Sequence, residues 1–91
     1  MTPPQHILTD IHLRETLAAG ANAVVKKAWD DFGRSIRRER IARRLSLRTF
    51  AKRMKVTGQM LAYLERGERR WTHKRAQLAV KLLTRQEQWP D

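Results

Sequence analysis

Basic side chains are the residues of this sequence whose type and spacing point most directly to a chemistry. The 91 residues include 20 Lys and Arg but only nine Asp and Glu, which gives a formal net charge of +11. Residues 34–75 alone carry a net charge of +12, whereas residues 1–33 sum to −1 and residues 76–91 to zero. Because such a block repels itself, a polyanion is the simplest partner that stabilises it. We therefore expect nucleic acid as the first partner and an anionic membrane surface as the second, against the alternative of a merely solvated basic face.

Side chains suited to catalysis or metal binding are few and scattered. The three histidines, His6, His12 and His73, lie at no metal-ligand spacing, and the chain contains no cysteine. The adjacent acids Asp30 and Asp31 are typical of a helix N-terminus rather than of an acid–base pair. No glycine-rich phosphate loop occurs. We therefore expect a protein that is not an enzyme and that uses no metal or other cofactor.

The sequence also bears on location. No apolar run reaches the ~18 residues that a membrane span needs, and the first residues, Met-Thr-Pro-Pro-Gln-His, lack the basic and apolar regions of a signal peptide. Without cysteine, a disulfide scaffold is excluded. We expect a cytoplasmic protein associated with the nucleoid and not with a membrane.

The basic side chains must be positioned by regular elements, and the spacing of the hydrophobic residues predicts that these elements are helices. Apolar residues recur three or four positions apart, and neither sustained strand alternation nor a hairpin dipeptide occurs. The sequence predicts an all-α bundle of four to five helices with an N-terminal helical extension. The expected parts are a flexible tail at 1–8, the extension at 9–29, a DNA-binding domain at 30–85 and a C-terminal tail at 86–91.

Residues that cap or interrupt helices indicate the boundaries. Gly20 and Asn22 interrupt the extension and favour two helices there, with Asn22 capping the second. Asp30 and Asp31 are expected to begin the next helix, because carboxylates satisfy its free backbone donors. A final helix is expected to begin at Thr72 or the residue after it.

Two short helices are predicted inside the basic block. Ser46 is expected to cap the first, which ends near Met54, and Thr57 to cap the second, which spans 58–66. Gly67 follows at the position where a helix end favours a left-handed residue, which glycine adopts at no steric cost.

The connection between these helices has the features of a helix-turn-helix. Ala51 provides the small side chain that a close helix crossing needs, and Val56 provides an apolar side chain to fill the turn. Thr57 and Gln59, with the backbone of Gly58, form a polar N-terminal end on the second helix. In a helix-turn-helix, this end enters the major groove of DNA.

The segment LSLRTFAKRMKVT at 45–57, with the later triplet Glu65-Arg66-Gly67, resembles the XRE/Cro family of lambda-repressor-like DNA-binding domains of phages and bacteria. The likeness covers about residues 32–83. It implies a structural ion pair between Arg40 and Glu65 that joins two helices, and loss of one partner of a buried pair costs about 3–5 kcal/mol.

The resemblance also implies which side chains face DNA. The positions matched to the groove-facing side are Thr57, Gly58, Gln59, Ala62 and Tyr63. Gln59 is the best base reader, because its amide can pair with N6 and N7 of adenine. Tyr63 is equally suited to packing against a neighbouring helix. The positions matched to phosphate contacts are Arg48, Lys52, Arg69, Arg70, His73 and Lys74, and the planar fork of arginine suits phosphate oxygens.

The sequence departs from the family's pattern in three respects. Leu47 stands where many relatives carry a phosphate-contacting Gln, so that contact is expected to be missing. Arg44 and Lys55 replace frequent glycines, and because a left-handed residue with a Cβ costs about 1–2 kcal/mol, we expect these turns to differ locally. The chain also stops short of a full fifth helix of the family, which makes Trp89 the expected apolar anchor of the C-terminus.

The extension at 9–29 has two open interpretations. It covers the core face that the family's fifth helix covers, or it forms a dimer interface. The apolar side chains available for either role are Leu13, Leu17, Val24, Val25 and Trp29.

The resemblance implies a transcriptional repressor that binds a palindromic double-stranded DNA operator as a homodimer. An antitoxin that binds a protein toxin as well as its own operator is the main alternative, because such proteins add a partner-binding segment to this scaffold. RNA binding and a basic membrane-surface helix have less support, since the sequence predicts no aromatic sheet platform and no single cationic face.

Overall fold

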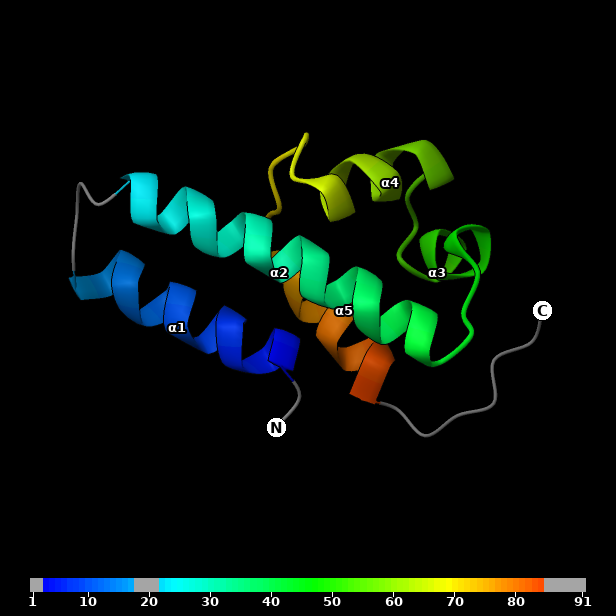
Figure 1. Ribbon diagram of the computed structural model, residues 1–91, viewed down its shortest axis with the longest axis horizontal. Helices are drawn as coiled ribbons and strands as arrows, with labels where there is room; N and C mark the ends of the chain where they lie inside the picture. The colour runs from blue at the N-terminus through cyan, green and yellow to red at the C-terminus, as the bar shows by residue number, and fades with distance from the viewer. Residues whose placement is uncertain (1–2, 18–21, 85–91) are drawn as a thin grey trace.

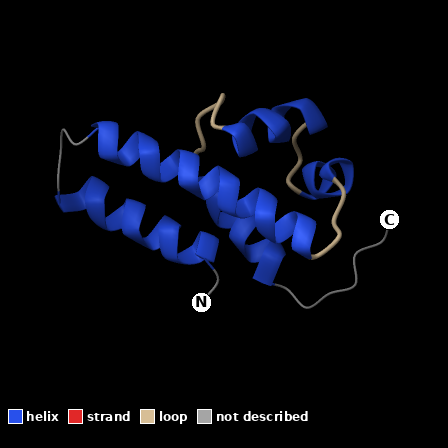
Figure 2. Ribbon diagram, viewed as in Figure 1, coloured by secondary structure: helices blue, strands red, loops and turns tan. Residues whose placement is uncertain are grey.

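Five helices make up the part of the chain that the structure describes. The computed structural model describes residues 3–17 and 22–84, and Figure 1 shows the helices in chain order. Their bounds are α1 Pro3–Leu17, α2 Asn22–Ala42, α3 Leu47–Arg53, α4 Gly58–Arg66 and α5 His73–Thr84. Those two ranges contain no strand (Figure 2), and none of their helices has the length and apolar character to cross a membrane. The predicted all-α fold of four to five helices is confirmed.

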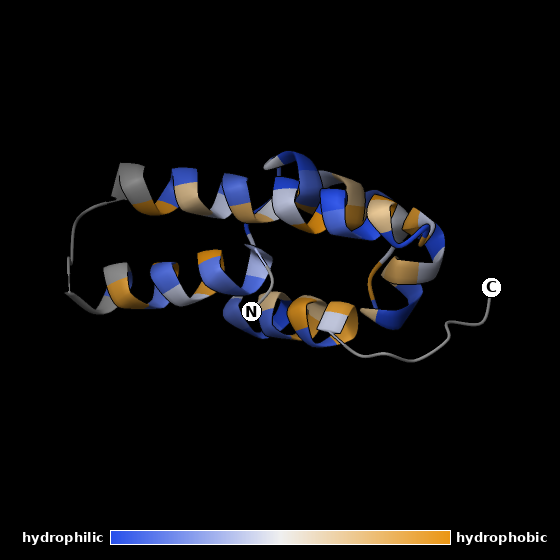
Figure 3. Cartoon of the chain, turned by 60° about the horizontal axis from the view of Figure 1, so that its bottom comes forward, coloured by the Kyte–Doolittle hydropathy of each residue, from blue (hydrophilic) through white to orange (hydrophobic). Residues whose placement is uncertain are grey.

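Helix α2 is the longest element, and α1, α4 and α5 all contact it. Helices α1 and α2 run side by side in opposite directions (Figure 1), and Figure 3 shows hydrophobic residues on the side of α2 that faces α1 and α5. Phe32 and Ile36 of α2 are fully buried, and Trp29 is 6% exposed. The ring of Phe32 meets Trp29 and Trp71 edge to face, at centroid distances of 5.7 and 4.8 Å. One core therefore joins α2 to the loop that precedes α5.

The beginning of α1 corrects the predicted flexible tail at 1–8, because the helix already starts at Pro3. Proline is tolerated in a first helical turn, where its missing N–H has no helical partner to lose. Pro4, Leu8 and Ile11 then share one face at helical spacing, and all three are buried. Burial of this face explains why the segment is helical.

The predicted helix start at Asp30 and Asp31 is also wrong, because α2 continues through both residues. Each aspartate pairs with a cation on its own helix, Asp30 with Lys26 at 3.8 Å and Asp31 with Arg34 at 3.1 Å. An aspartate that caps a helix and an aspartate that forms an ion pair within a helix, at (i, i+3) or (i, i+4) spacing, cannot be distinguished from the neighbouring residues alone. Buried apolar residues continue at helical spacing from Val25 to Ile36, on both sides of the aspartates, which favours one continuous helix.

The two helices expected within the extension are present, since α1 ends at Leu17 and α2 begins at Asn22. Helix α1 packs on α2 and α5, with Ile11 fully buried, so α1 covers the core of its own chain. Leu13 is 55% exposed and takes no part in that core. Of the remaining predictions, the side chains of Leu17, Val24 and the predicted cap Asn22 are not described, and the C-terminal tail 86–91 with Trp89 lies outside the described residues.

Candidate nucleic-acid interface

Helices α3 and α4 begin at the predicted caps. The Ser46 hydroxyl accepts a hydrogen bond from the backbone N–H of Thr49 at 3.0 Å, and the Thr57 hydroxyl accepts one from Met60 at 3.0 Å. Each side chain satisfies a backbone donor that the first turn leaves free. Gly67 ends α4 in the left-handed region, with φ of 78°. The sequence therefore determined where this pair of helices begins and ends.

The connection between α3 and α4 is tight and well bonded. Ala51 is 2% exposed within the core, which fits its expected place at the helix crossing. The backbone N–H of Val56 donates to the carbonyl of Ala51 at 3.0 Å, and the partly buried Val56 side chain packs against the core. The polar N-terminal end of α4 follows immediately.

The turns at Arg44 and Lys55 keep the geometry that glycine would adopt. Their φ angles are 58° and 61°, so the expectation that these turns differ locally is wrong. Hydrogen bonds beyond each turn, from Leu45 to the Arg40 carbonyl and from Val56 to the Ala51 carbonyl, both at 3.0 Å, hold the chain in this path. The surrounding helix contacts therefore outweigh a local cost of about 1–2 kcal/mol at each residue.

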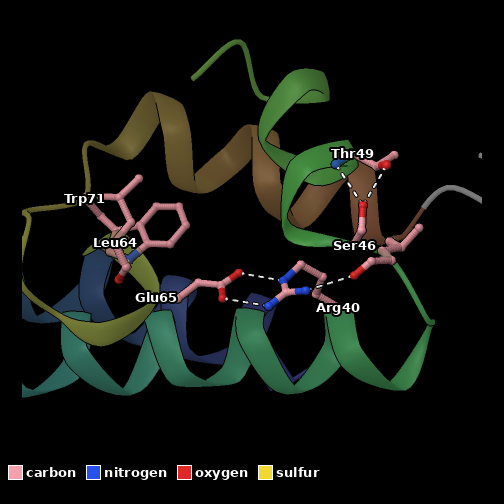
Figure 4. A network of polar contacts seen from close by, with 7 residues as sticks. Arg40, Ser46, Thr49, Leu64, Glu65 and Trp71 are labelled. Carbon is pink, nitrogen blue, oxygen red and sulfur yellow. Dashed lines mark hydrogen bonds and ion pairs between the residues drawn. The ribbon is translucent and has the colours of Figure 1, made fainter. Parts of the chain in front are cut away.

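A buried ion pair joins α2 to α4, as the family resemblance implied (Figure 4). Arg40 Nε and Nη2 donate to the two carboxylate oxygens of Glu65 at 2.9 and 3.1 Å. Arg40 Nη1 donates to the Leu45 carbonyl at 2.9 Å, which extends the contact to the turn before α3. The side chains of Arg40 and Glu65 are 11% and 3% exposed. This two-point contact fixes the rotation of α4 relative to α2.

Trp71 and Gly33 complete the attachment of α4, although neither residue was expected to have a role from the sequence. The Trp71 indole Nε1 donates to the Leu64 carbonyl at 3.0 Å, near the C-terminal end of α4 (Figure 4). A Cβ on Gly33 would lie 2.5 Å from the same carbonyl oxygen. Gly33 therefore lets α2 approach the end of α4 closely. In the sequence, a tryptophan four residues after Gly67, the residue that ends α4, was the available sign that Trp71 packs back onto this helix.

The five residues predicted to contact bases share the N-terminal part of α4 and its outer side. Thr57 and Gln59 are exposed, whereas Gly58, Ala62 and Tyr63 are partly exposed. A Cβ on Gly58 would meet no atom within 4 Å, so this backbone is open to approach. The side-chain amide of Gln59 donates to the Tyr63 hydroxyl at 2.9 Å, which orients both side chains on one outer face.

The cations predicted to contact phosphate lie on α3, in the loop after α4 and at the start of α5. Among the described residues no ion pair involves five exposed cations of the predicted phosphate set: Arg48, Lys52, Arg69, Arg70 and Lys74. The Tyr63 ring lies 5.3 Å from the guanidinium of Arg66 and 5.9 Å from that of Arg69. These guanidiniums therefore belong to the same surface as the outer side of α4. Arg66 pairs with Glu68 at 3.1 Å, whereas the charge of Arg69 is compensated by no acid of the described chain and is available to an anion.

His73 is the exception in the predicted phosphate set, because its ring is turned toward α1. Its Nε2 lies 2.7 Å from Glu15 Oε2, and its ring centroid lies 4.3 Å from that of His12. Its Nδ1 is buried and makes no hydrogen bond. The predicted phosphate contact did not take into account that α1 packs on α5 and that its side chains contact His73.

The histidines are not all scattered in space, because the fold brings the rings of His12 and His73 together. Hydrogen bonding and attraction from His73 hold the pKa of the Glu15 carboxyl below its usual value near 4.5. In the part of the chain that is described, no three His, Asp or Glu residues are arranged to hold a metal ion.

Comparison with protein-family models, with curated proteins and with solved structures gives no match to this chain. Its function must therefore be inferred from its own residues and their geometry.

Proposed function

We propose that this protein is a sequence-specific double-stranded DNA-binding regulator, and that it acts as a dimeric repressor of a promoter. The observation that carries the proposal is the outer face of α4. A capped helix there presents Thr57, Gln59 and an open backbone at Gly58, and exposed cations without carboxylate partners lie on the preceding helix α3 and in the loop after α4. Polar side chains at the N-terminal end of a helix read bases in the major groove, and flanking cations bind phosphates.

Gln59 is the proposed base reader. Its bond to Tyr63 uses one amide donor, so the carbonyl oxygen and the second donor remain to pair with adenine. The buried Arg40–Glu65 pair supports this role from the opposite side of α4, because it fixes the direction in which Gln59 points.

A homodimer on a palindromic operator follows from the same proposal. Two copies of α4 related by a two-fold axis would enter successive major grooves about 34 Å apart. The antitoxin alternative gains no separate support, because Ile11, Val25 and Trp29 of the predicted partner segment are buried in the core of this chain.

The test is selection of bound fragments from a random pool of DNA duplexes, followed by affinity measurements on the full chain. We expect an inverted repeat to be selected. Gln59→Ala should then weaken binding to that site by about 1–3 kcal/mol and leave binding to unrelated duplex unchanged. Gln77→Ala is the matched control, because it removes an exposed glutamine that lies on α5 and outside the predicted base-contact set.

An equal loss for specific and unrelated duplexes in Gln59→Ala would show that Gln59 does not read bases. Selection of single-stranded or duplex RNA in preference to DNA would overturn the assignment of the nucleic acid.

A further inference from the structure

A cavity of about 520 Å³ lies between the N-terminal half of α2 and the loop that joins α4 to α5. Trp29 and Trp71 contribute apolar surface to it, and Lys26, Asp30, Arg69 and Arg70 contribute charge. Small-molecule sites in proteins have volumes of about 300–1,000 Å³ and combine an apolar lining with a few polar groups. The size and the composition of the cavity both fit such a site.

The cavity has an excess of positive charge. Its two acids already have partners, since Asp30 pairs with Lys26 at 3.8 Å and Glu68 with Arg66 at 3.1 Å. Arg69 and Arg70 have no carboxylate partner among the described residues. The guanidinium charge that remains uncompensated at the cavity is therefore that of Arg69 and Arg70, and it favours an anion.

The tryptophans offer the cavity apolar surface rather than hydrogen-bond donors. Trp71 is 3% exposed and its indole N–H is bonded to the Leu64 carbonyl at 3.0 Å. Trp29 is 6% exposed, and its indole N–H points to Glu15 at 3.4 Å. A ligand that contacts both rings needs an apolar body, and aromatic rings pack well against indoles.

We propose that this cavity binds a small aromatic anion, with its ring against Trp29 and Trp71 and its carboxylate or phosphate on Arg69 and Arg70. Both arginines also belong to the predicted phosphate contacts, so the small anion and DNA compete for the same guanidinium groups. This second half rests on the proposed function. The cavity would let binding of a small anion change the affinity for DNA.

The first test measures binding to the full chain without DNA, using 1-naphthoate as the probe. We expect the indole N–H signals of Trp29 and Trp71 to shift in nitrogen–proton NMR spectra, with a dissociation constant on the order of 1 mM or tighter. The cation 1-naphthylmethylamine has the same ring system and should leave these signals unchanged. No shift at about 10 mM naphthoate, or equal shifts with both compounds, would overturn the proposal.

A charge-matched pair of variants tests the position of the ligand. Lys26 lines the cavity and Lys27 does not, yet each has an aspartate four residues further along α2. Lys26→Glu should weaken naphthoate binding about fivefold, as expected for the reversal of one exposed charge, whereas Lys27→Glu should not change it. Equal effects of the two variants would mean that only overall charge attracts the probe, and would overturn the cavity as the site.

The last test addresses the competition. Naphthoate at about ten times its dissociation constant should lower the affinity for the selected duplex about tenfold, because mutually exclusive ligands obey this linkage. Unchanged DNA affinity in the presence of bound naphthoate would overturn the competition and leave the cavity as a binding site. If no specific duplex is found, the proposed function fails, and the indole shifts still decide whether the cavity binds the anion.

Discussion

Helices α4 and α1 both pack against α2, but only α4 adds buried polar contacts to its apolar ones. Helix α4 buries Leu61 and Leu64 and is held in addition by directional polar contacts: the Arg40–Glu65 pair, with Glu65 only 3% exposed, and the Trp71 bond to the Leu64 carbonyl. Such contacts depend on angle as well as distance, so they allow one rotation of the helix.

Helix α1 is held mainly by apolar burial of Leu8 and Ile11. Its polar contact with α5, between Glu15 and His73, lies at the surface, where the two side chains are 35% and 38% exposed. Apolar burial is non-directional, and exposed ion pairs contribute about 0–1 kcal/mol. The rotation of a helix about its axis is therefore specified more strongly for α4, whose outer face is proposed to read DNA, than for α1.

The largest expected effect is on the buried ion pair. Arg40→Ala should destabilise the protein by about 3–5 kcal/mol, because it leaves the carboxylate of Glu65 buried without a partner. Urea unfolding measures the change. The matched control is Arg43→Ala, which breaks a partly exposed pair between Glu39 of α2 and the residue that follows this helix, and which should cost about 0–1 kcal/mol. Similar losses in the two variants would break the comparison between buried and exposed attachment.

Two glycines next to α4 give the second prediction. Gly33→Ala should cost about 1–2 kcal/mol net, since its Cβ would lie 2.5 Å from the backbone oxygen of Leu64 and force α2 and α4 apart. Gly58→Ala meets no atom within 4 Å and should stabilise the protein by up to about 0.5 kcal/mol. Thermal unfolding of both variants tests this, and equal effects would mean that α2 and α4 are not in close contact.

The turn into α4 gives the third prediction. Lys55 has φ of 61°, and Lys55→Gly should raise the free energy of unfolding by about 0.5–1 kcal/mol by relieving this strain. Lys55→Ala removes the same charge but keeps the Cβ, so it should give no such gain. If both variants stabilise equally, charge repulsion rather than backbone strain is the cause.

The smallest expected effect concerns the attachment of α1. The contact with His73 lowers the pKa of Glu15 in the folded protein, so its stabilisation is complete above the usual value near 4.5 and is lost as the pH falls through the lowered value. Unfolding free energies at about pH 6 and about pH 3 should therefore differ less in Glu15→Gln than in the original chain, by well under about 1 kcal/mol at this partly exposed site. An identical pH dependence in both would show that this contact does not stabilise α1.

Local signals predicted α3 and α4 well and α1 and α2 poorly. Ser46, Thr57 and Gly67 act on their own helix ends, so their roles were visible in the sequence. Asp30 and Asp31 were taken for a cap because a cap and a mid-helix ion pair look alike over a few residues. Pro3 and Pro4 were taken for a tail because the helix that follows them is stabilised by α2 and α5, which come later in the chain.

The candidate interface shows the same division. Gln59 and the cations of the phosphate set were predicted from the family resemblance and from the polar N-terminal end of the expected helix, both of which are properties of the sequence. The contact of His73 with Glu15 was not foreseen, because Glu15 lies 58 residues earlier in the chain. The cavity was not anticipated either, since Trp29 and Trp71 approach each other only through the packing of the α4–α5 loop on α2.

By itself the sequence determined the helical class, the caps of α3 and α4 and the placement of uncompensated charge, because these depend on neighbours a few residues apart. Only the tertiary structure decided the left-handed turns at Arg44 and Lys55, the close approach at Gly33 and the capture of His73 by α1. Each of these is a locally unfavourable or ambiguous choice. Contacts between distant segments decide each of these local conformations, because their free energies add up in the folded chain.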